Sequence, residues 1–174
     1  MKRSDSAGPR ERPAPPDDPG SAAAAAEVAV RILGGAAQSA AGLTRRLRQR
    51  GFTEQAAAEA TAAMRGYGYL NDAAFANSIA ARRQRTGHGR MHVGAELRAR
   101  GLEPDAIAAT LAAVDTDAER AAALELGRRF ADRASRDIAD RQGRQRLGGA
   151  LQRRGFDSDT VGWVLRELDG ERHS

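Results

Sequence analysis

Three arginines lie close together in a stretch of the chain that carries no acid. Arg45, Arg46 and Arg48 fall in a segment with no aspartate or glutamate between residues 28 and 53. A guanidinium binds phosphate or carboxylate oxygens through a rigid fork of N–H donors. The cluster is therefore either a solvated helix face or a surface for an anionic partner, and the missing acids give the second interpretation equal weight with the first.

A second arginine group surrounds a segment with two glycines, Thr86-Gly87-His88-Gly89. The flanking cations, with no acid among them, are Arg82, Arg83, Arg85 and Arg90. The glycines would let backbone N–H groups approach a phosphate or a protein surface closely. The alternative is an ordinary loop between helices. A P-loop is excluded because the Gly-Lys-Ser/Thr ending is missing.

Few other residues suggest chemistry. His88 and His92 are four residues apart, but Gly89 is expected to cap a helix between them, so the two rings need not share a face as metal ligands. The pair Asp115 and Asp117 favours helix capping over a calcium loop, because the rest of the twelve-residue pattern is absent. The chain has no cysteine, which excludes disulfides and thiolate sites. We expect no cofactor, no metal site and no enzymatic activity.

The elements that hold these arginines are marked by a hexapeptide that occurs three times. Its copies are Leu47–Phe52, Leu97–Leu102 and Leu151–Phe156. An apolar residue lies one helical turn before each copy, and an N-cap candidate lies eight positions before it: Ser39, Gly89 and Gly143. Each copy therefore ends a helix, with its glycine in the left-handed conformation that such an exit requires. The arginine before each glycine sits where a cation offsets the helix dipole, so we interpret Arg50, Arg100 and Arg154 as structural.

A second helix follows each glycine, and another helix precedes each pair. The N-cap residues are predicted at Thr53, Glu103 and Asp157, and the apolar residues around each cap have the spacing of a hydrophobic staple. The preceding helices are predicted over residues 27–35, from Asn71 or Asp72, and from Thr116 or Asp117. No segment alternates as a strand does. The sequence predicts an all-α fold of three tandem three-helix repeats, residues 27–70, 71–115 and 116–170, in an elongated, curved helical array.

The composition predicts a disordered N-terminal tail and a cytoplasmic location, and it shows that charge is unevenly distributed along the chain. Residues 1–26 hold five of the six prolines and are predicted to be a disordered tail. No segment resembles a signal peptide or a membrane span, which favours the cytoplasm. Residues 27–100 carry twelve arginines against five acids, whereas residues 101–174 carry twelve against fourteen. The positive charge on the first two repeats indicates an anionic partner.

Several motifs resemble the RecX family of regulatory proteins. They include the segment from Ser39 to Phe52, the link Gly68-Tyr69-Leu70-Asn71-Asp72, and the last hexapeptide with Val161 and Leu165 after it. The likeness covers roughly residues 28–168. It implies a non-enzymatic protein of three three-helix repeats, which binds in the groove of the RecA filament on single-stranded DNA. It also implies inhibition of RecA strand exchange, ATP hydrolysis and co-protease activity, and hence a role in DNA repair, recombination and the SOS response.

The resemblance and the charges together define the expected partners. We expect a monomer that binds the RecA filament and binds single-stranded DNA weakly and without sequence preference, with duplex DNA left open. Membranes are not an expected partner. The alternative is a helical, helix-turn-helix-like DNA-binding regulator. The candidate contacts to filament or DNA are Arg45, Arg46, Arg48, Arg82, Arg83, Arg85, Arg90 and Arg98.

Overall fold

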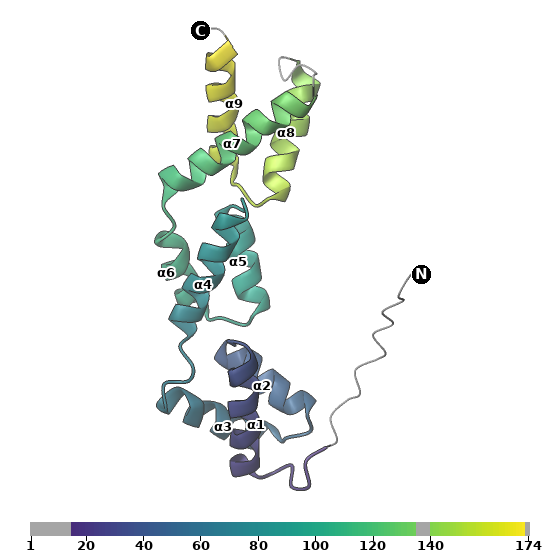
Figure 1. The fold of residues 1–174 in the computed structure, drawn as a ribbon, viewed down its shortest axis with the longest axis vertical. Coiled ribbons are helices and arrows are strands. Elements are labelled where there is room, and N and C mark those ends of the chain that lie inside the picture. The colour runs from purple at the N-terminus through teal and green to yellow at the C-terminus, as the bar shows by residue number, and fades with distance from the viewer. Residues whose placement is uncertain (1–14, 135–139, 173–174) are drawn as a thin grey trace, which may run out of the picture. The chain divides into compact units, whose positions relative to one another are not determined.

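The chain folds into helices throughout the region that the structure, a computed structural model, describes: residues 15–134 and 140–172. In those ranges it forms nine α-helices and no strand, which confirms the predicted all-α fold of three-helix repeats (Figure 1). The chain divides into two compact units, Met1–Asn71 and Asp72–Ser174. The first unit holds one repeat and the second holds two. None of the helices in the described ranges is long and apolar enough to cross a bilayer.

Unit 1 consists of α1 (Ala22–Gly35), α2 (Ala40–Gln49) and α3 (Glu54–Gly66). Each helix begins at a hydroxyl residue whose side chain accepts a hydrogen bond from the backbone of the first turn, at Ser21, Ser39 and Thr53. The core of the unit joins alanines of α1 and α3 to Leu43 and Leu47, which are completely buried. The small alanines let the helices lie close together, so one face of α2 is fixed and the other is left to solvent.

The start of the first helix differs from the prediction. The sequence places a tail over residues 1–26 and a helix over 27–35, but α1 begins at Ala22. Alanine has the highest helix propensity, and the Ser21 hydroxyl, which accepts from the Ala24 N–H, supplies the cap that the run needs. The segment before the helix is also held, because the Thr53 N–H donates to the Pro19 carbonyl. Residues 1–14 of the predicted tail lie outside the described residues.

The three glycine exits have the predicted conformation. Gly51, Gly101 and Gly155 have φ values of 99°, 76° and 84°, which is the left-handed region. The staple residues that follow them, Phe52, Leu102 and Phe156, are buried, as are their partners one turn into the next helix. The hexapeptide is therefore a sharp turn between two packed helices, as its sequence indicates.

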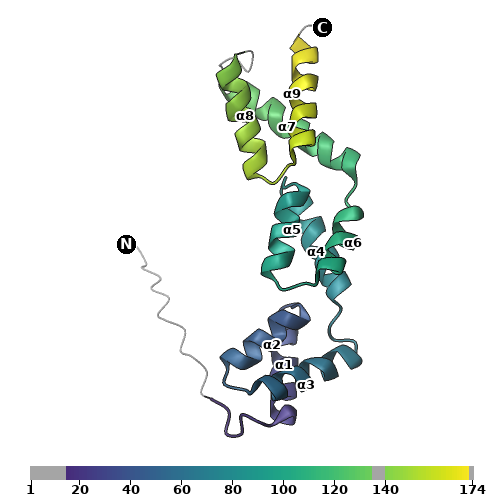
Figure 2. The same ribbon diagram turned by 180° about the vertical axis from the view of Figure 1, so that it is seen from behind.

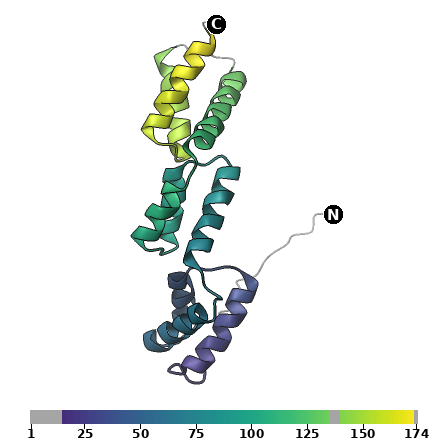
Figure 3. The same cartoon turned by 90° about the vertical axis from the view of Figure 1, so that its left-hand side faces the viewer.

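Unit 2 contains, among its described residues, six helices that form the second and third repeats of the chain. The second repeat has α4 (Asp72–Arg85), α5 (Arg90–Ala99) and α6 (Pro104–Ala112), which Figure 2 shows from behind. The third repeat has α7 (Thr116–Ala134), α8 (Arg141–Arg153) and α9 (Ser158–Arg172), the green and yellow helices that lie side by side in Figure 3. Each repeat has its own core of leucine, isoleucine, valine and alanine side chains. The two repeats also form hydrogen bonds to each other, described below.

The predicted N-cap at Gly143 is wrong. The structure begins α8 at Arg141 and places Gly143 in its first turn. The cap is Asp140, whose carboxylate accepts a hydrogen bond from the Gly143 N–H. An aspartate supplies the acceptor that a glycine lacks, so the better cap three residues earlier extends the helix. The other two caps, Ser39 and Gly89, are as predicted.

Candidate functional site

The arginines of α2 form an exposed cationic surface on unit 1. Leu43 and Leu47 face the core, which turns Arg45, Arg46 and Arg48 towards solvent. In the part of the chain that the structure describes, the side chains of Arg45 and Arg46 form no hydrogen bond or ion pair. Arg48 lies 3.8 Å from Glu54, but the two side chains are 56% and 80% exposed, so this contact holds the guanidinium weakly. The three charges are available to a partner.

A shallow hollow runs along this surface. It is lined by side chains of successive turns of α2: Ala41, Thr44, Arg45, Arg48 and Gln49. The Thr44 hydroxyl lies 2.9 Å from the Thr61 hydroxyl of α3, which fixes the two helices at the edge of the hollow. Because Arg45 and Arg48 both line the hollow, their two guanidinium groups can contact the oxygens of one anion that lies along the helix.

Arg82 and Arg83 are, in contrast, bound to the carboxylate of Glu96 on α5, although the Arg82 side chain itself remains 52% exposed. The Glu96 side chain is only 9% exposed. It accepts hydrogen bonds from Arg82 Nη2 at 2.8 Å, from Arg100 Nη2 at 3.0 Å and from Arg83 Nε. Burial alone would raise the pKa of Glu96. The hydrogen bond and the charge of Arg83, together with Arg82 and Arg100, outweigh this effect of burial and hold the pKa of Glu96 below its ordinary value. These arginines stabilise a carboxylate within the fold.

Arg90 is held just as firmly, by Glu119 of α7. Its backbone N–H donates to Glu119 Oε1 at 2.6 Å, and its Nε donates to Oε2 at 2.7 Å. The Glu119 side chain is 2% exposed. Arg90 Nη2 also donates to the Thr116 hydroxyl at 3.0 Å, and Asp157 lies 3.9 Å from its Nε. Arg90 therefore links the second repeat to the third.

The glycine segment joins the same two repeats. The Gly89 N–H donates to the Arg154 carbonyl at 2.9 Å, and the Met91 N–H donates to the Gly155 carbonyl at 3.0 Å. The free amides at the start of α5 thus meet the free carbonyls at the end of α8, a pairing that also matches the two helix dipoles. A Cβ on Gly89 would overlap the Gly155 backbone. The glycines permit this close contact between repeats, so these amides do not form the phosphate cradle that the sequence left open.

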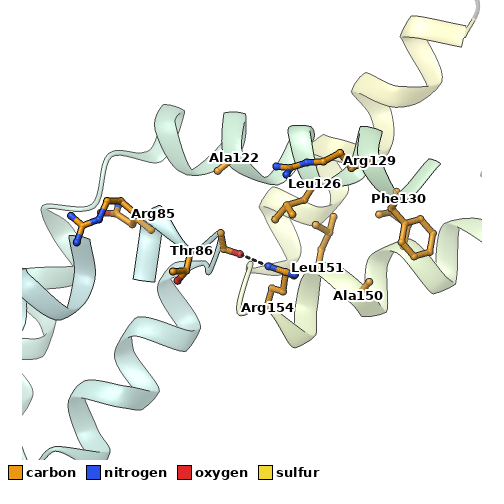
Figure 4. A pocket seen from close by; sticks show the side chains of 12 residues that line it. Arg85, Thr86, Ala122, Leu126, Arg129, Phe130, Ala150, Leu151 and Arg154 are labelled. Atoms are coloured by element: carbon orange, nitrogen blue, oxygen red, sulfur yellow. Dashed lines mark hydrogen bonds between the residues drawn. The ribbon is translucent and has the colours of Figure 1, made fainter. Parts of the chain in front are cut away.

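The two remaining predicted contacts, Arg85 and Arg98, are exposed. Neither side chain has a hydrogen bond or ion pair among the residues that the structure describes. Arg98 lies on α5 with its guanidinium beside Gly94. Arg85 ends α4 and lines a pocket that reaches into the third repeat (Figure 4). Among the eight predicted residues, Arg45, Arg46, Arg48, Arg85 and Arg98 have side chains that are free or nearly free, whereas Arg82, Arg83 and Arg90 are bound to the carboxylates of Glu96 and Glu119.

The two histidines do come together, although no metal site results in the described ranges. The ring centroids of His88 and His92 are 4.5 Å apart. The His88 Nδ1 lies 3.0 Å from the Thr86 hydroxyl. Burial lowers the pKa of His88, and the nearby charges of His92, Arg83 and Arg154 lower it further. No group of three or more metal-binding side chains is present among the described residues.

Sequence reasoning also missed an acid-free run of arginines on α8, which nothing in the structure assigns to a partner. Arg141, Arg146 and Arg153 are exposed on this helix, and residues 141–156 contain no acid. The absence of acids from this run is visible in the sequence. It was missed because the net charge was summed over residues 101–174, which contain fourteen acids elsewhere. The pocket that Arg85 lines was also missed, because its walls come from residues 84–87 and 122–154.

Comparison with known proteins identifies the family. Residues 71–111 match the model of the second three-helix domain of RecX, and residues 117–165 match the model of the third. A Regulatory protein RecX of Stenotrophomonas maltophilia (strain R551-3) is 36% identical over 119 residues, which cover 68% of this chain and 71% of that protein. The chain belongs to the RecX family. A second relative, the Regulatory protein RecX of Mycobacterium sp. (strain KMS), is 33% identical over 168 residues and covers 92% of this chain and 90% of its own length.

Two solved structures share the fold of this RecX family member. RecX from Lactobacillus salivarius superposes with a TM-score of 0.79 at 19% identity, over 85% of this chain and 96% of that one. Another regulatory protein RecX gives a TM-score of 0.73 at 19% identity, over 82% and 70% of the two chains. At this identity the likeness concerns the fold alone.

Proposed function

We propose that this chain is a non-enzymatic regulator that binds in the groove of the RecA filament on single-stranded DNA. Binding inhibits strand exchange, ATP hydrolysis and co-protease activity, and so modulates DNA repair, recombination and the SOS response. Membership of a family whose named relatives are regulatory proteins supports the proposal. The observation that carries it is the surface of Arg45, Arg46 and Arg48 on α2, whose charges are not neutralised by the fold.

This surface acts by phosphate and carboxylate contact. Its three guanidinium groups reach DNA phosphates or acidic side chains of the recombinase, and each phosphate contact releases a counterion, so binding weakens as salt rises. DNA alone is bound weakly. Strong single-strand binders stack bases on rows of exposed aromatic side chains, whereas the large aromatics exposed in the described ranges are Tyr67 and Tyr69. The filament, which offers protein and DNA together, is the better ligand.

The decisive experiment measures ATP hydrolysis by the cognate RecA on single-stranded DNA while the full chain is titrated in. We expect inhibition at substoichiometric amounts, because a protein in the groove affects neighbouring subunits. Unchanged hydrolysis and strand exchange at an excess of the chain would overturn the proposal. Tight binding to one duplex sequence, retained at moderate salt, would instead support the helix-turn-helix-like regulator.

The role of α2 is tested by changing Arg45, Arg46 and Arg48 together to alanine. We expect the concentration for half-inhibition to rise about tenfold, which corresponds to about 1.4 kcal/mol of binding free energy. The slope of log affinity for single-stranded DNA against log salt concentration should fall in magnitude by about 2, because each of three lost phosphate contacts contributes about 0.7. The charge-matched control changes Arg146, Arg153 and Arg166 to alanine. If the two triple variants inhibit equally, α2 is not the contact surface.

A further inference from the structure

A pocket of about 750 Å³ lies within unit 2, between the end of α4 and helices α7 and α8. Its floor is apolar. Leu147 and Leu151 are buried there, and Leu126 and Phe130 of α7 remain partly exposed towards the opening (Figure 4). A volume of this size accepts two or three large side chains. The two repeats thus leave apolar surface uncovered where they meet.

The mouth of this pocket is cationic. Arg85 of α4, Arg129 of α7 and Arg154 after α8 are among its twelve lining residues, none of which is acidic. In Figure 4 the Arg85 guanidinium points away from Leu126 and Leu151, so it faces a partner only after its side chain turns. The Arg85 side chain has no hydrogen bond or ion pair among the described residues. Arg129 lies 3.4 Å from Glu125, but both side chains are more than half exposed. Arg154 Nη1 donates to the Gly87 carbonyl at 3.4 Å, a long bond that leaves its other N–H groups available.

The combination selects a protein segment over nucleic acid. A sugar-phosphate backbone would lose its hydration on an apolar floor, and Phe130 is the only aromatic side chain in the pocket on which a base could stack. A peptide with one or two bulky apolar side chains fills the floor and removes the exposed apolar surface from water. Carboxylates beside those side chains would then meet the arginines at the mouth, in the bidentate geometry that guanidinium favours.

We propose that this pocket docks an acidic segment of the recombinase that carries bulky apolar side chains. The inference rests on the proposed function for the identity of the partner, while the pocket supplies the chemistry that recognises it. It assigns a second contact to unit 2, distinct from the arginine surface of α2. The segment binds by its side chains, so its recognition depends on both the floor and the mouth of the pocket.

The test uses short overlapping peptides that cover the cognate RecA sequence, displayed on an array and probed with the full chain. We expect binding to peptides that combine acidic with large apolar residues. The variant Arg85→Glu/Arg129→Glu should lose at least tenfold in affinity for them, about 1.4 kcal/mol. Leu126→Ser, on the floor, should weaken the same peptides. The matched control Arg146→Glu/Arg153→Glu changes the charge equally but lies outside the pocket, and should bind as the parent does.

The outcomes separate the two proposals. If the chain inhibits RecA but binds no acidic, apolar peptide, or if both charge-reversed variants bind alike, the docking pocket is overturned while the proposed function stands. If the chain fails to inhibit RecA at all, the function falls. In the contrary outcome, a single-stranded oligonucleotide displaces the bound peptide, and the variant Arg85→Glu/Arg129→Glu no longer binds that oligonucleotide. This pair of results would assign the pocket to nucleic acid and overturn the proposal. Circular dichroism of every variant confirms that the helices are intact.

Discussion

The arginines of α2 and those around the glycine segment look alike in the sequence and behave differently in the fold. Arg45 and Arg46 have no acidic partner among the described residues, whereas Arg83 is bound to Glu96 and Arg90 to Glu119. The acids come from 13 and 29 residues further along the chain. A cluster without nearby acids in sequence is therefore not always free in space. Burial of the carboxylates decides which arginines support the fold and which can bind a partner.

The largest difference in stability is expected between a variant that lacks an arginine bound to a buried carboxylate and a variant that lacks an exposed, unpaired arginine. Arg90→Ala leaves the buried Glu119 carboxylate with only the backbone N–H of residue 90, so unit 2 should lose about 3 kcal/mol. Arg98→Ala, an exposed arginine on the same helix, should cost less than about 0.5 kcal/mol. Trp163, the only tryptophan, lies in the third repeat and reports unfolding of unit 2 by fluorescence in urea. Equal stability of the two variants would show that Arg90 is not a structural link.

The same comparison can be made at the glycine turns. Gly155→Ala places a Cβ against the backbone of His92, at φ 84°, and should cost about 2–3 kcal/mol because the contact between repeats must open. Gly51→Ala has a similar φ of 99°, but its Cβ would meet the Pro16 ring at 3.0 Å. That variant should cost about 1 kcal/mol, mainly for the left-handed conformation. Urea unfolding followed by circular dichroism measures both, and a larger loss for Gly51→Ala would contradict the assigned junction.

A smaller effect should appear in the pH dependence of stability. The pKa of Glu96 lies below its ordinary value of 4.5, so the folded state binds fewer protons than the unfolded state in acid. The stabilisation from Glu96 is therefore complete above about pH 4.5 and is lost as the pH falls through the lowered pKa. Glu96→Gln should flatten this part of the stability curve. If the free energies of unfolding of the parent and of Glu96→Gln change in parallel with pH, the Glu96 carboxylate does not cause this pH dependence.

The fold was predictable because its signals are local. The glycine exits, the caps at Ser39 and Thr53 and the staple at Phe52 each depend on residues within one or two turns of the chain. The first helix was placed too late because a short alanine run within a polar, proline-rich tail has little apolar pattern, although Ser21 could have marked its cap. The arginine surface of α2 was predictable for a similar reason, since its helix has an obvious buried face.

The rest of the candidate site depends on contacts between repeats, which local patterns do not encode. Nothing near Arg90 in sequence indicates Glu119, and nothing in the Gly87–Gly89 segment indicates that its amides would meet the end of α8. The pocket beside Arg85 exists only because α4, α7 and α8 come together. The acid-free run of arginines on α8 is different, because it could have been found by counting charges over one helix instead of over two repeats.

The smallest expected effect on stability is also the sharpest test of the comparison. Changing Arg45, Arg46 and Arg48 together to alanine should alter the free energy of unfolding by less than about 0.5 kcal/mol, because alanine favours the helix and the weak contact to Glu54 is exposed. The removal of mutual repulsion could even raise it slightly. A loss comparable to that of Arg90→Ala, measured by circular dichroism in urea, would mean that these arginines support the fold. Their assignment as a free binding surface would then fail.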